Sequence, residues 1–161
     1  MQTSTADHRA SPPRIEIPRD YNAAHDLLQR NAGRGGKVAF IEAGSGAELT
    51  YAELAERSHR FANALRGHGF MPEHRMLVAM SDTLEWPVVF LGCILAGVVP
   101  VAANTMLTAS DFEFMLRDSR AHGLVVSAAL WPTFRDIIGD DHGFQRIDVA
   151  NDVAEGGPER R

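Results

Sequence analysis

The longest uncharged stretch of the chain, from Trp86 to Ser110, constrains the fold more than any other feature. Its length would suffice for a membrane-spanning helix, because about 20 apolar residues cross the hydrocarbon core of a bilayer. Two prolines and two glycines interrupt the stretch, however, and its β-branched residues gather behind Gly97. A buried helix that ends at Gly97 and a buried strand over 98–102 explain both features, so we expect no membrane partner.

Hydrophobic spacing elsewhere alternates between the helical period and the strand period. Thr50 and Glu53 have the spacing of a capping box, which predicts a helix that begins there. The expected elements are a helix capped by Asn22, a hairpin over 38–42 and 48–50, and helices near 51–66, 83–96, 108–117 and 134–138 that alternate with strands at 76–80, 98–102, 124–127 and 147–149. This order predicts the α/β class, with a mostly parallel sheet, flanking helices and right-handed crossovers.

Composition divides the chain of 161 residues into three parts. Residues 1–19 are rich in Ser, Thr, Pro and Arg and predict a disordered leader, whereas 20–149 hold the expected α/β unit. Residues 150–161 predict a polar tail that buries almost nothing. Because the chain turns polar directly after a strand, we expect an incomplete sheet that is open at its C-terminal edge.

Charge and cysteine content exclude several classes of protein. With 16 basic and 21 acidic residues the net charge is −5, which offers no footprint for nucleic acid or an anionic membrane. The single cysteine, Cys93, has apolar neighbours and predicts a buried, inert thiol in a reducing compartment. The polar N-terminus lacks the apolar run of a signal peptide, so we expect a cytoplasmic protein.

Familiar catalytic motifs do not match. A phosphate loop fails at Asn31 and at Val38, and the glycines of 33–36 precede a strand rather than open a helix. The histidines are scattered, and the densest possible ligand group, at 140–142, falls in an expected loop. Ser45 lacks the flanking glycine of a nucleophile elbow. These residues predict neither a catalytic group nor a metal site.

One loop supports a ligand hypothesis. Asn104 and Thr105 follow the expected strand at 98–102, and open α/β sheets bind ligands beyond the carboxyl ends of their strands. The two residues are therefore candidates for a ligand-facing loop. The alternative is an ordinary turn that the Asn and Thr side chains stabilise.

Several segments together resemble a known family. Tyr21-Asn22-Ala23-Ala24, Gly33-Arg34-Gly35-Gly36-Lys37 and Leu49-Thr50-Tyr51-Ala52-Glu53-Leu54 resemble the opening of the adenylate-forming (AMP-binding) ligases. Ala96-Gly97-Val98-Val99-Pro100-Val101 and the run from Leu107 to Ser119 are more narrowly similar to the benzoate-CoA ligase branch. The resemblance covers roughly residues 20–130 and implies an incomplete N-terminal subdomain of the adenylate-forming ligase fold.

The resemblance also implies chemistry. Such ligases use ATP and Mg to form an acyl-adenylate, and then pass the acyl group to coenzyme A; the branch implies a benzoate-type aromatic acid. The family's phosphate loop and adenylation lysine lie downstream of the matched region, and Lys37, the only lysine beside 15 arginines, matches neither lysine that the family uses. We therefore expect a catalytically inactive chain that binds none of these cofactors alone.

Three interpretations remain open at this stage. The chain is an N-terminal ligase fragment, a stand-alone non-catalytic interaction module derived from such a ligase, or a small enzyme with an unrecognised site. The first two predict different partners. A fragment pairs with the missing C-terminal remainder of the ligase, or self-associates through the open sheet edge, whereas a module binds another protein.

Overall fold

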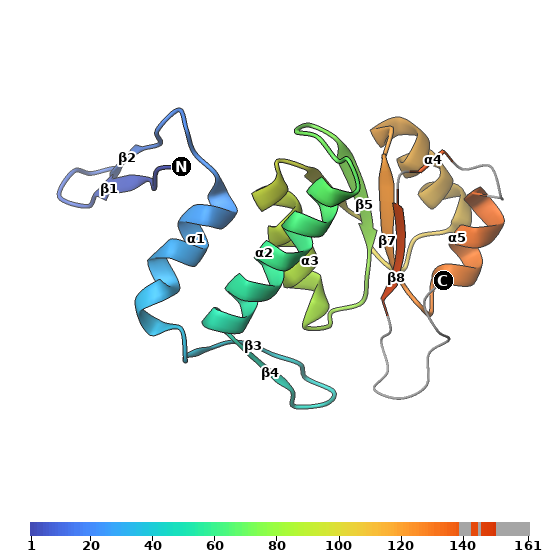
Figure 1. Cartoon of the computed structure of the whole chain (residues 1–161), viewed down its shortest axis with the longest axis horizontal. Helices are drawn as coiled ribbons and strands as arrows, with labels where there is room; N and C mark the ends of the chain where they lie inside the picture. The colour runs from blue at the N-terminus through green and yellow to red at the C-terminus, as the bar shows by residue number, and fades with distance from the viewer. Residues whose placement is uncertain (139–142, 145, 151–161) are drawn as a thin grey trace.

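The computed structural model describes residues 1–138, 143–144 and 146–150 (Figure 1). Every helix and strand expected from the hydrophobic pattern is present within one to three residues at most ends, and two further strands lie near the N-terminus. In chain order the elements are β1 (Thr5–Asp7), β2 (Arg14–Glu16), α1 (Ala23–Asn31), the 3-10 helix η1 (Ala32–Arg34), β3 (Val38–Ile41), β4 (Glu48–Thr50), α2 (Tyr51–Gly67), β5 (Arg75–Ala79), α3 (Glu85–Ala96), β6 (Val99–Ala102), α4 (Ala109–Ser119), β7 (Gly123–Ser127), α5 (Trp131–Ile138) and β8 (Arg146–Ala150). The predicted polar tail, apart from Ala150, lies outside the described residues.

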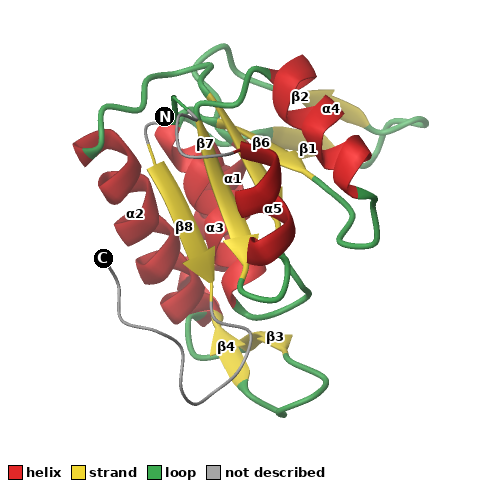
Figure 2. Cartoon of the chain, turned by 90° about the vertical axis from the view of Figure 1, so that its right-hand side faces the viewer, coloured by secondary structure: helices red, strands yellow, loops and turns green. Residues whose placement is uncertain are grey.

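Four strands form one parallel sheet in the order β6-β5-β7-β8 (Figure 2). The α/β class with flanking helices, predicted from the alternation of elements, is thereby confirmed. Within the described part of the chain β6 pairs only with β5 and β8 only with β7, so both edges of this sheet are unpaired there. The antiparallel hairpin of β3 and β4 forms a separate two-stranded sheet.

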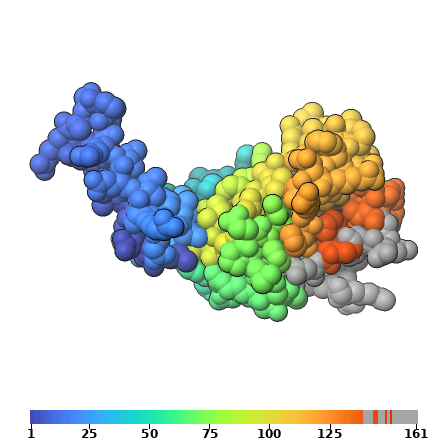
Figure 3. Space-filling model, turned by 90° about the horizontal axis from the view of Figure 1, so that it is seen from above, coloured from blue at the N-terminus to red at the C-terminus, as the bar shows by residue number. Residues whose placement is uncertain are grey.

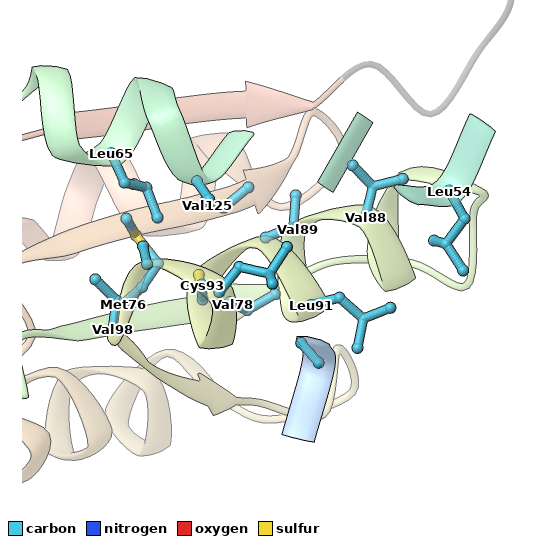
Figure 4. Packing of buried hydrophobic residues seen from close by; sticks show 14 of the residues in the cluster. Leu54, Leu65, Met76, Val78, Val88, Val89, Leu91, Cys93, Val98 and Val125 are labelled. Carbon is cyan, nitrogen blue, oxygen red and sulfur yellow. The ribbon is translucent and has the colours of Figure 1, made fainter. Parts of the chain in front are cut away.

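Side chains of β5 alternate between two apolar layers, which explains its continuous apolar sequence. Met76 and Val78 pack in the layer that contains buried residues of α2 and α3 (Figure 4). Leu77 and Ala79 point the other way, where Phe112 of α4 and Phe134 of α5 cover them. Helices therefore cover both faces of the sheet, with one apolar layer on each face.

The uncharged stretch forms the buried helix and the strand that its punctuation predicts. Gly97 ends α3 in the left-handed conformation, with φ of 82°, and the chain enters β6 two residues later. Cys93 lies inside this helix with none of its surface exposed. Among the described residues, the structure contains no helix with the length and apolarity that a bilayer crossing requires.

Local hydrogen bonds set where three helices begin. The Asn22 side chain accepts a hydrogen bond from the backbone of His25 and caps α1, as predicted. Thr50 and Glu53 form the predicted capping box of α2, and Thr108 and Asp111 form another at α4. Each box satisfies backbone groups that have no partner within the helix.

The N-terminal segment differs from the predicted disordered leader, because β1 and β2 pair as an antiparallel hairpin within residues 1–19. All residues of both strands are exposed, and Figure 3 shows the segment projecting from the body of the molecule. Its attachment is polar: Ser4 donates two hydrogen bonds to Asp26, which is 3% exposed. This contact joins residues 22 positions apart, which composition alone does not predict.

Candidate functional site

The carboxyl edge of the parallel sheet contains a topological switch point. The chain leaves β5 toward β6 through α3 on one face, and leaves β7 toward β8 through α5 on the opposite face. Since β5 and β7 are neighbours, their following loops diverge, and open α/β sheets bind ligands in the crevice that such divergence creates. We call the loops after β5, β6 and β7, at 80–84, 103–107 and 128–130, together with Ser127 at the end of β7, the carboxyl-edge site.

Hydroxyl groups occupy the two loops at the switch point. Ser127, the last residue of β7, is fully buried, and its Oγ accepts a hydrogen bond of 2.9 Å from the backbone N of Ser81. The Thr83 backbone N donates to the Ser81 carbonyl at 2.8 Å, and the Thr83 hydroxyl is buried without a partner among the described residues. The Thr83 hydroxyl can therefore still form a hydrogen bond just before α3. Leaving a buried hydroxyl unsatisfied costs roughly 1–3 kcal/mol.

Asn104 and Thr105 lie one strand away, behind β6. Asn104 is exposed, and its Oδ1 accepts a hydrogen bond of 2.9 Å from the backbone N of Met106. Thr105 is half-buried, and Met106 is 89% exposed at the tip of the loop. The Asn104 oxygen is thus engaged in a turn, as the alternative interpretation of an ordinary turn expects. The loop itself lies at the predicted edge of the sheet.

Asp111 and Cys93, two titratable groups near the site, have structural roles. Asp111 accepts hydrogen bonds from the Thr108 hydroxyl and backbone, which lower the pKa of its carboxyl, so it acts as a cap. Burial raises the pKa of the Cys93 thiol to about 12, which makes it unreactive at neutral pH. No three His, Cys, Asp or Glu side chains of the described residues are close enough together to hold a metal ion, and the predicted acidic group at 140–142 lies outside the described residues.

The arrangement can therefore orient a neutral polar ligand, but it offers no fixed positive charge. Lys37 is exposed in the turn before β3, which belongs to the two-stranded sheet rather than to the carboxyl-edge site. Stabilising charge on a transferring phosphoryl or nucleotidyl group requires cations or clustered donors aimed at that charge. Sequence reasoning missed Ser81, Thr83 and Ser127, although a hydroxyl directly after an apolar strand is a pattern that could have found them.

Comparison with known proteins identifies the family. Residues 27–158, well over half of the chain, match the family described as AMP-binding enzyme. The chain belongs to the AMP-binding enzyme family. Within that family it is 48% identical over 156 residues to a benzoate–CoA ligase of Thauera aromatica, which covers 94% of this chain and 29% of the relative. It is also 40% identical over 124 residues to a 4-hydroxybenzoate–CoA/benzoate–CoA ligase of Rhodopseudomonas palustris, covering 76% of this chain and 23% of the relative.

Solved structures of AMP-binding enzymes share the fold. A benzoate CoA ligase from Burkholderia xenovorans LB400 superposes with a TM-score of 0.75 and 42% identity, covering 81% of this chain and 26% of that one. An anthranilate CoA ligase in complex with anthranoyl-AMP superposes with a TM-score of 0.76 and 30% identity, covering 83% and 26%. The fold predicted from the resemblance, that of the N-terminal part of adenylate-forming ligases, is confirmed.

This AMP-binding chain spans less than a third of the length of the curated relatives that it matches. The activity of those relatives therefore belongs to proteins that contain much more polypeptide than this chain. The resemblance drawn from Leu49–Leu54, Ala96–Val101 and Leu107–Ser119 falls inside the matched region, so these segments pointed to the correct family.

Proposed function

We propose that this chain is the N-terminal α/β part of an aromatic acid CoA ligase of the benzoate type. The observation that carries the proposal is the 48% identity over 156 residues to a benzoate–CoA ligase. In the complete enzyme a carboxylate oxygen attacks the α-phosphorus of ATP, pyrophosphate leaves with Mg, and the coenzyme A thiolate then displaces AMP. The unpaired, buried Cys93 supports assignment to a reducing compartment such as the cytoplasm.

The chain alone is inactive under this proposal. The only lysine of the sequence is Lys37, and the phosphate-loop pattern is not matched at any position. The carboxyl-edge site supplies hydroxyl and amide groups and the exposed Asp82, and none of these stabilises negative charge in a transition state as cations do. The chain therefore binds ATP, Mg and coenzyme A only together with the rest of a ligase.

An exchange assay tests this function. Benzoate-dependent exchange of pyrophosphate into ATP is measured for this chain and for a fusion of this chain to the part of the Thauera aromatica ligase that follows the shared region. We expect no exchange from the chain and clear exchange from the fusion. Exchange by the chain alone would refute its inactivity, and an inactive but folded fusion would refute the assignment to this ligase.

Asn104 and Thr105 are proposed to face the ligand in that complete enzyme. Asn104→Ala removes both the turn and the Nδ2 donor, whereas Asn104→Asp keeps an oxygen that can accept from Met106. If Asn104 contacts the ligand through its amide group, both variants of the fusion raise KM for benzoate or ATP. Asn63→Ala, on the surface of α2, is the matched control and leaves KM unchanged. A fusion in which Asn104→Asp matches the unsubstituted enzyme would limit Asn104 to a turn.

The alternative function is a stand-alone, non-catalytic interaction module. The unpaired edges of β6 and β8 in the described part of the sheet favour it, because such edges pair with other strands. The same edges allow the chain to self-associate. Sedimentation velocity separates these outcomes: concentration-dependent association supports the open edge of a fragment, and a monodisperse, cooperatively unfolding monomer supports the module.

A further inference from the structure

An apolar groove of about 280 Å³ lies between α1, β3, the start of α2 and the first half of α3, outside the carboxyl-edge site. The rings of Trp86 and Phe90 line it and stack with their centroids 4.9 Å apart. Phe40 of β3 and Leu27 of α1 line it as well, and they are 43% and 41% exposed. Ile41, the next residue of β3, is 64% exposed and does not line the groove. Clustered exposure of this kind marks a binding surface rather than ordinary scatter.

A positively charged side chain is held beside the groove. The Nε of Arg34 donates a hydrogen bond of 2.8 Å to Oδ1 of Asn31, itself a lining residue, and the guanidinium carbon lies 5.5 Å from the centroid of the Tyr51 ring. Arg34 forms no ion pair with any described residue. A guanidinium held by a hydrogen bond and a ring face is positioned to receive a carboxylate. The surface therefore fits a partner that presents an apolar side chain beside an acidic one.

Two observations favour a polypeptide over a small aromatic acid. First, β3 pairs only with β4 among the described residues, and an isolated two-stranded sheet is marginally stable in water, so the outer edge of β3 can receive another strand. Figure 1 shows this hairpin beside the ends of α1 and α2, two of the elements whose side chains line the groove. Second, a small acid that fills the groove leaves Ile41 uncovered.

The length of the relatives identifies the source of that polypeptide. The matched region is 29% of the Thauera aromatica ligase, so most of that chain lies outside it. We propose that the groove lined by Leu27, Phe40, Trp86 and Phe90, with Arg34 beside it, binds a segment of the ligase chain that follows the matched region. An apolar side chain of that segment enters the groove, and a carboxylate pairs with Arg34. This inference rests on the proposed function and adds the internal partner of this face.

Cysteine labelling tests directly whether a segment of the ligase covers the groove. Phe40→Cys and Phe114→Cys are prepared separately in the chain and in the fusion, and modification by N-ethylmaleimide is located by peptide mass spectrometry. Phe114 is the matched control because it is 65% exposed on α4, on the other face of the sheet. Cys93 reports folding, since it is fully buried and labels only when the core opens.

We expect the thiol at position 40 to react in the chain alone and to react at least about tenfold more slowly in the fusion, because a covered site labels only when it opens. The thiol at position 114 reacts equally in both proteins, and Cys93 stays unmodified. Adding Arg34→Gln to the fusion speeds labelling at position 40 by about threefold, as the loss of one exposed ion pair predicts.

Other outcomes overturn the inference. Equal labelling at position 40 in the chain and in a fusion with unmodified Cys93 shows that the ligase segment does not cover the groove. Protection of the chain alone by millimolar benzoate assigns the groove to a small acid, and protection that grows with chain concentration assigns it to a second copy. Pyrophosphate exchange is recorded on the same fusion, so an active fusion that labels at position 40 refutes this inference without refuting the proposed function.

Discussion

Two histidine rings lie stacked at the amino ends of the central strands. His74 precedes β5 and His122 precedes β7, and their ring centroids are 3.9 Å apart with an angle of 9° between the planes. The Nδ1 atoms accept hydrogen bonds from the backbone N of Met71, at 3.4 Å, and of Arg75, at 3.5 Å. A proton on either Nδ1 would remove an acceptor and place a positive charge beside the other ring and beside Arg75.

We expect this pair to make folding sensitive to mild acid, because the pKa of His122 is lowered in the folded chain. Burial, and then the charges of His74 and Arg75, lower the pKa of His122 below its ordinary value of 6.5. The folded chain therefore binds fewer protons than the unfolded chain below about pH 6.5, and the free energy of unfolding falls as the pH is lowered through that value. Urea denaturation between pH 7.5 and 5 measures this loss.

We expect His122→Gln to flatten the pH dependence, because glutamine cannot take up a proton. His59→Gln, at an exposed position of α2, is the matched control and retains the full dependence. If both variants lose stability with acid as steeply as the unsubstituted chain, the stacked pair is not responsible.

The contact between α2 and α3 depends on one position without a side chain. A Cβ atom on Gly92 would lie 2.8 Å from Cδ1 of Phe61 and 2.9 Å from the carbonyl oxygen of Ser58. The oxygen belongs to the backbone of α2, so an added methyl group must separate the helices rather than rotate a side chain. Gly92 thus allows the close packing of α2 on α3, whereas Gly97, the other glycine of the uncharged stretch, ends α3.

We expect Gly92→Ala to destabilise the chain by about 1–3 kcal/mol, as overpacking of a core does. Gly67→Ala is the control, since no heavy atom lies within 4 Å of its added Cβ and the position is the last residue of α2. Urea denaturation of both variants checks the difference. Equal stability of the two would show that the helices can move apart at little cost.

Helices were predictable from the sequence because their determinants are local. The capping box of Thr50 and Glu53 spans three residues, and Gly97 ends α3 through its own backbone conformation. The start of α3 has no such local signal, since Leu84 provides no side-chain cap, and the helix begins at Glu85 rather than near Thr83. The hairpin of β1 and β2 was missed because its anchor, the contact from Ser4 to Asp26, is not local.

The strand order of the sheet could not be read from the sequence in the same way. Right-handed crossovers restrict the order but do not decide whether β7 pairs beside β5 or beside β6. That choice places the switch point between β5 and β7, and with it the contact from Ser81 to Ser127. The sequence therefore led to Asn104 and Thr105, which follow one strand, and not to groups that only the pairing of two strands brings together.

One buried carboxylate, Asp26, accepts the most hydrogen bonds among the groups that attach the N-terminal hairpin to the body; Arg30 also donates to Ser4, and the backbone N of Gln2 donates to Asp20. Asp26 Oδ2 accepts hydrogen bonds from the Ser4 hydroxyl at 2.6 Å and from the Tyr21 hydroxyl at 3.2 Å, and Oδ1 lies 2.7 Å from Nε of Arg30. The hydrogen bond from Ser4 is the main cause that lowers the pKa of Asp26 to about 2. Its stabilising contribution is therefore complete at neutral pH and is lost only as the pH falls from about 3.8 toward 2.

Asp26→Asn tests whether this carboxylate holds the hairpin. The amide lacks the negative charge that pairs with Arg30 and strengthens the hydrogen bonds from Ser4. We expect trypsin to cut the variant after Arg9, Arg14 and Arg19 at least about tenfold faster than the unsubstituted chain, while the core stays resistant. Asp118→Asn, at an exposed position of α4, is the matched control and leaves the cleavage rate unchanged. Both strands are exposed and have no apolar cover, so we expect them to need the anchor. Unchanged cleavage of Asp26→Asn would instead mean that pairing of β1 with β2 resists the protease without it.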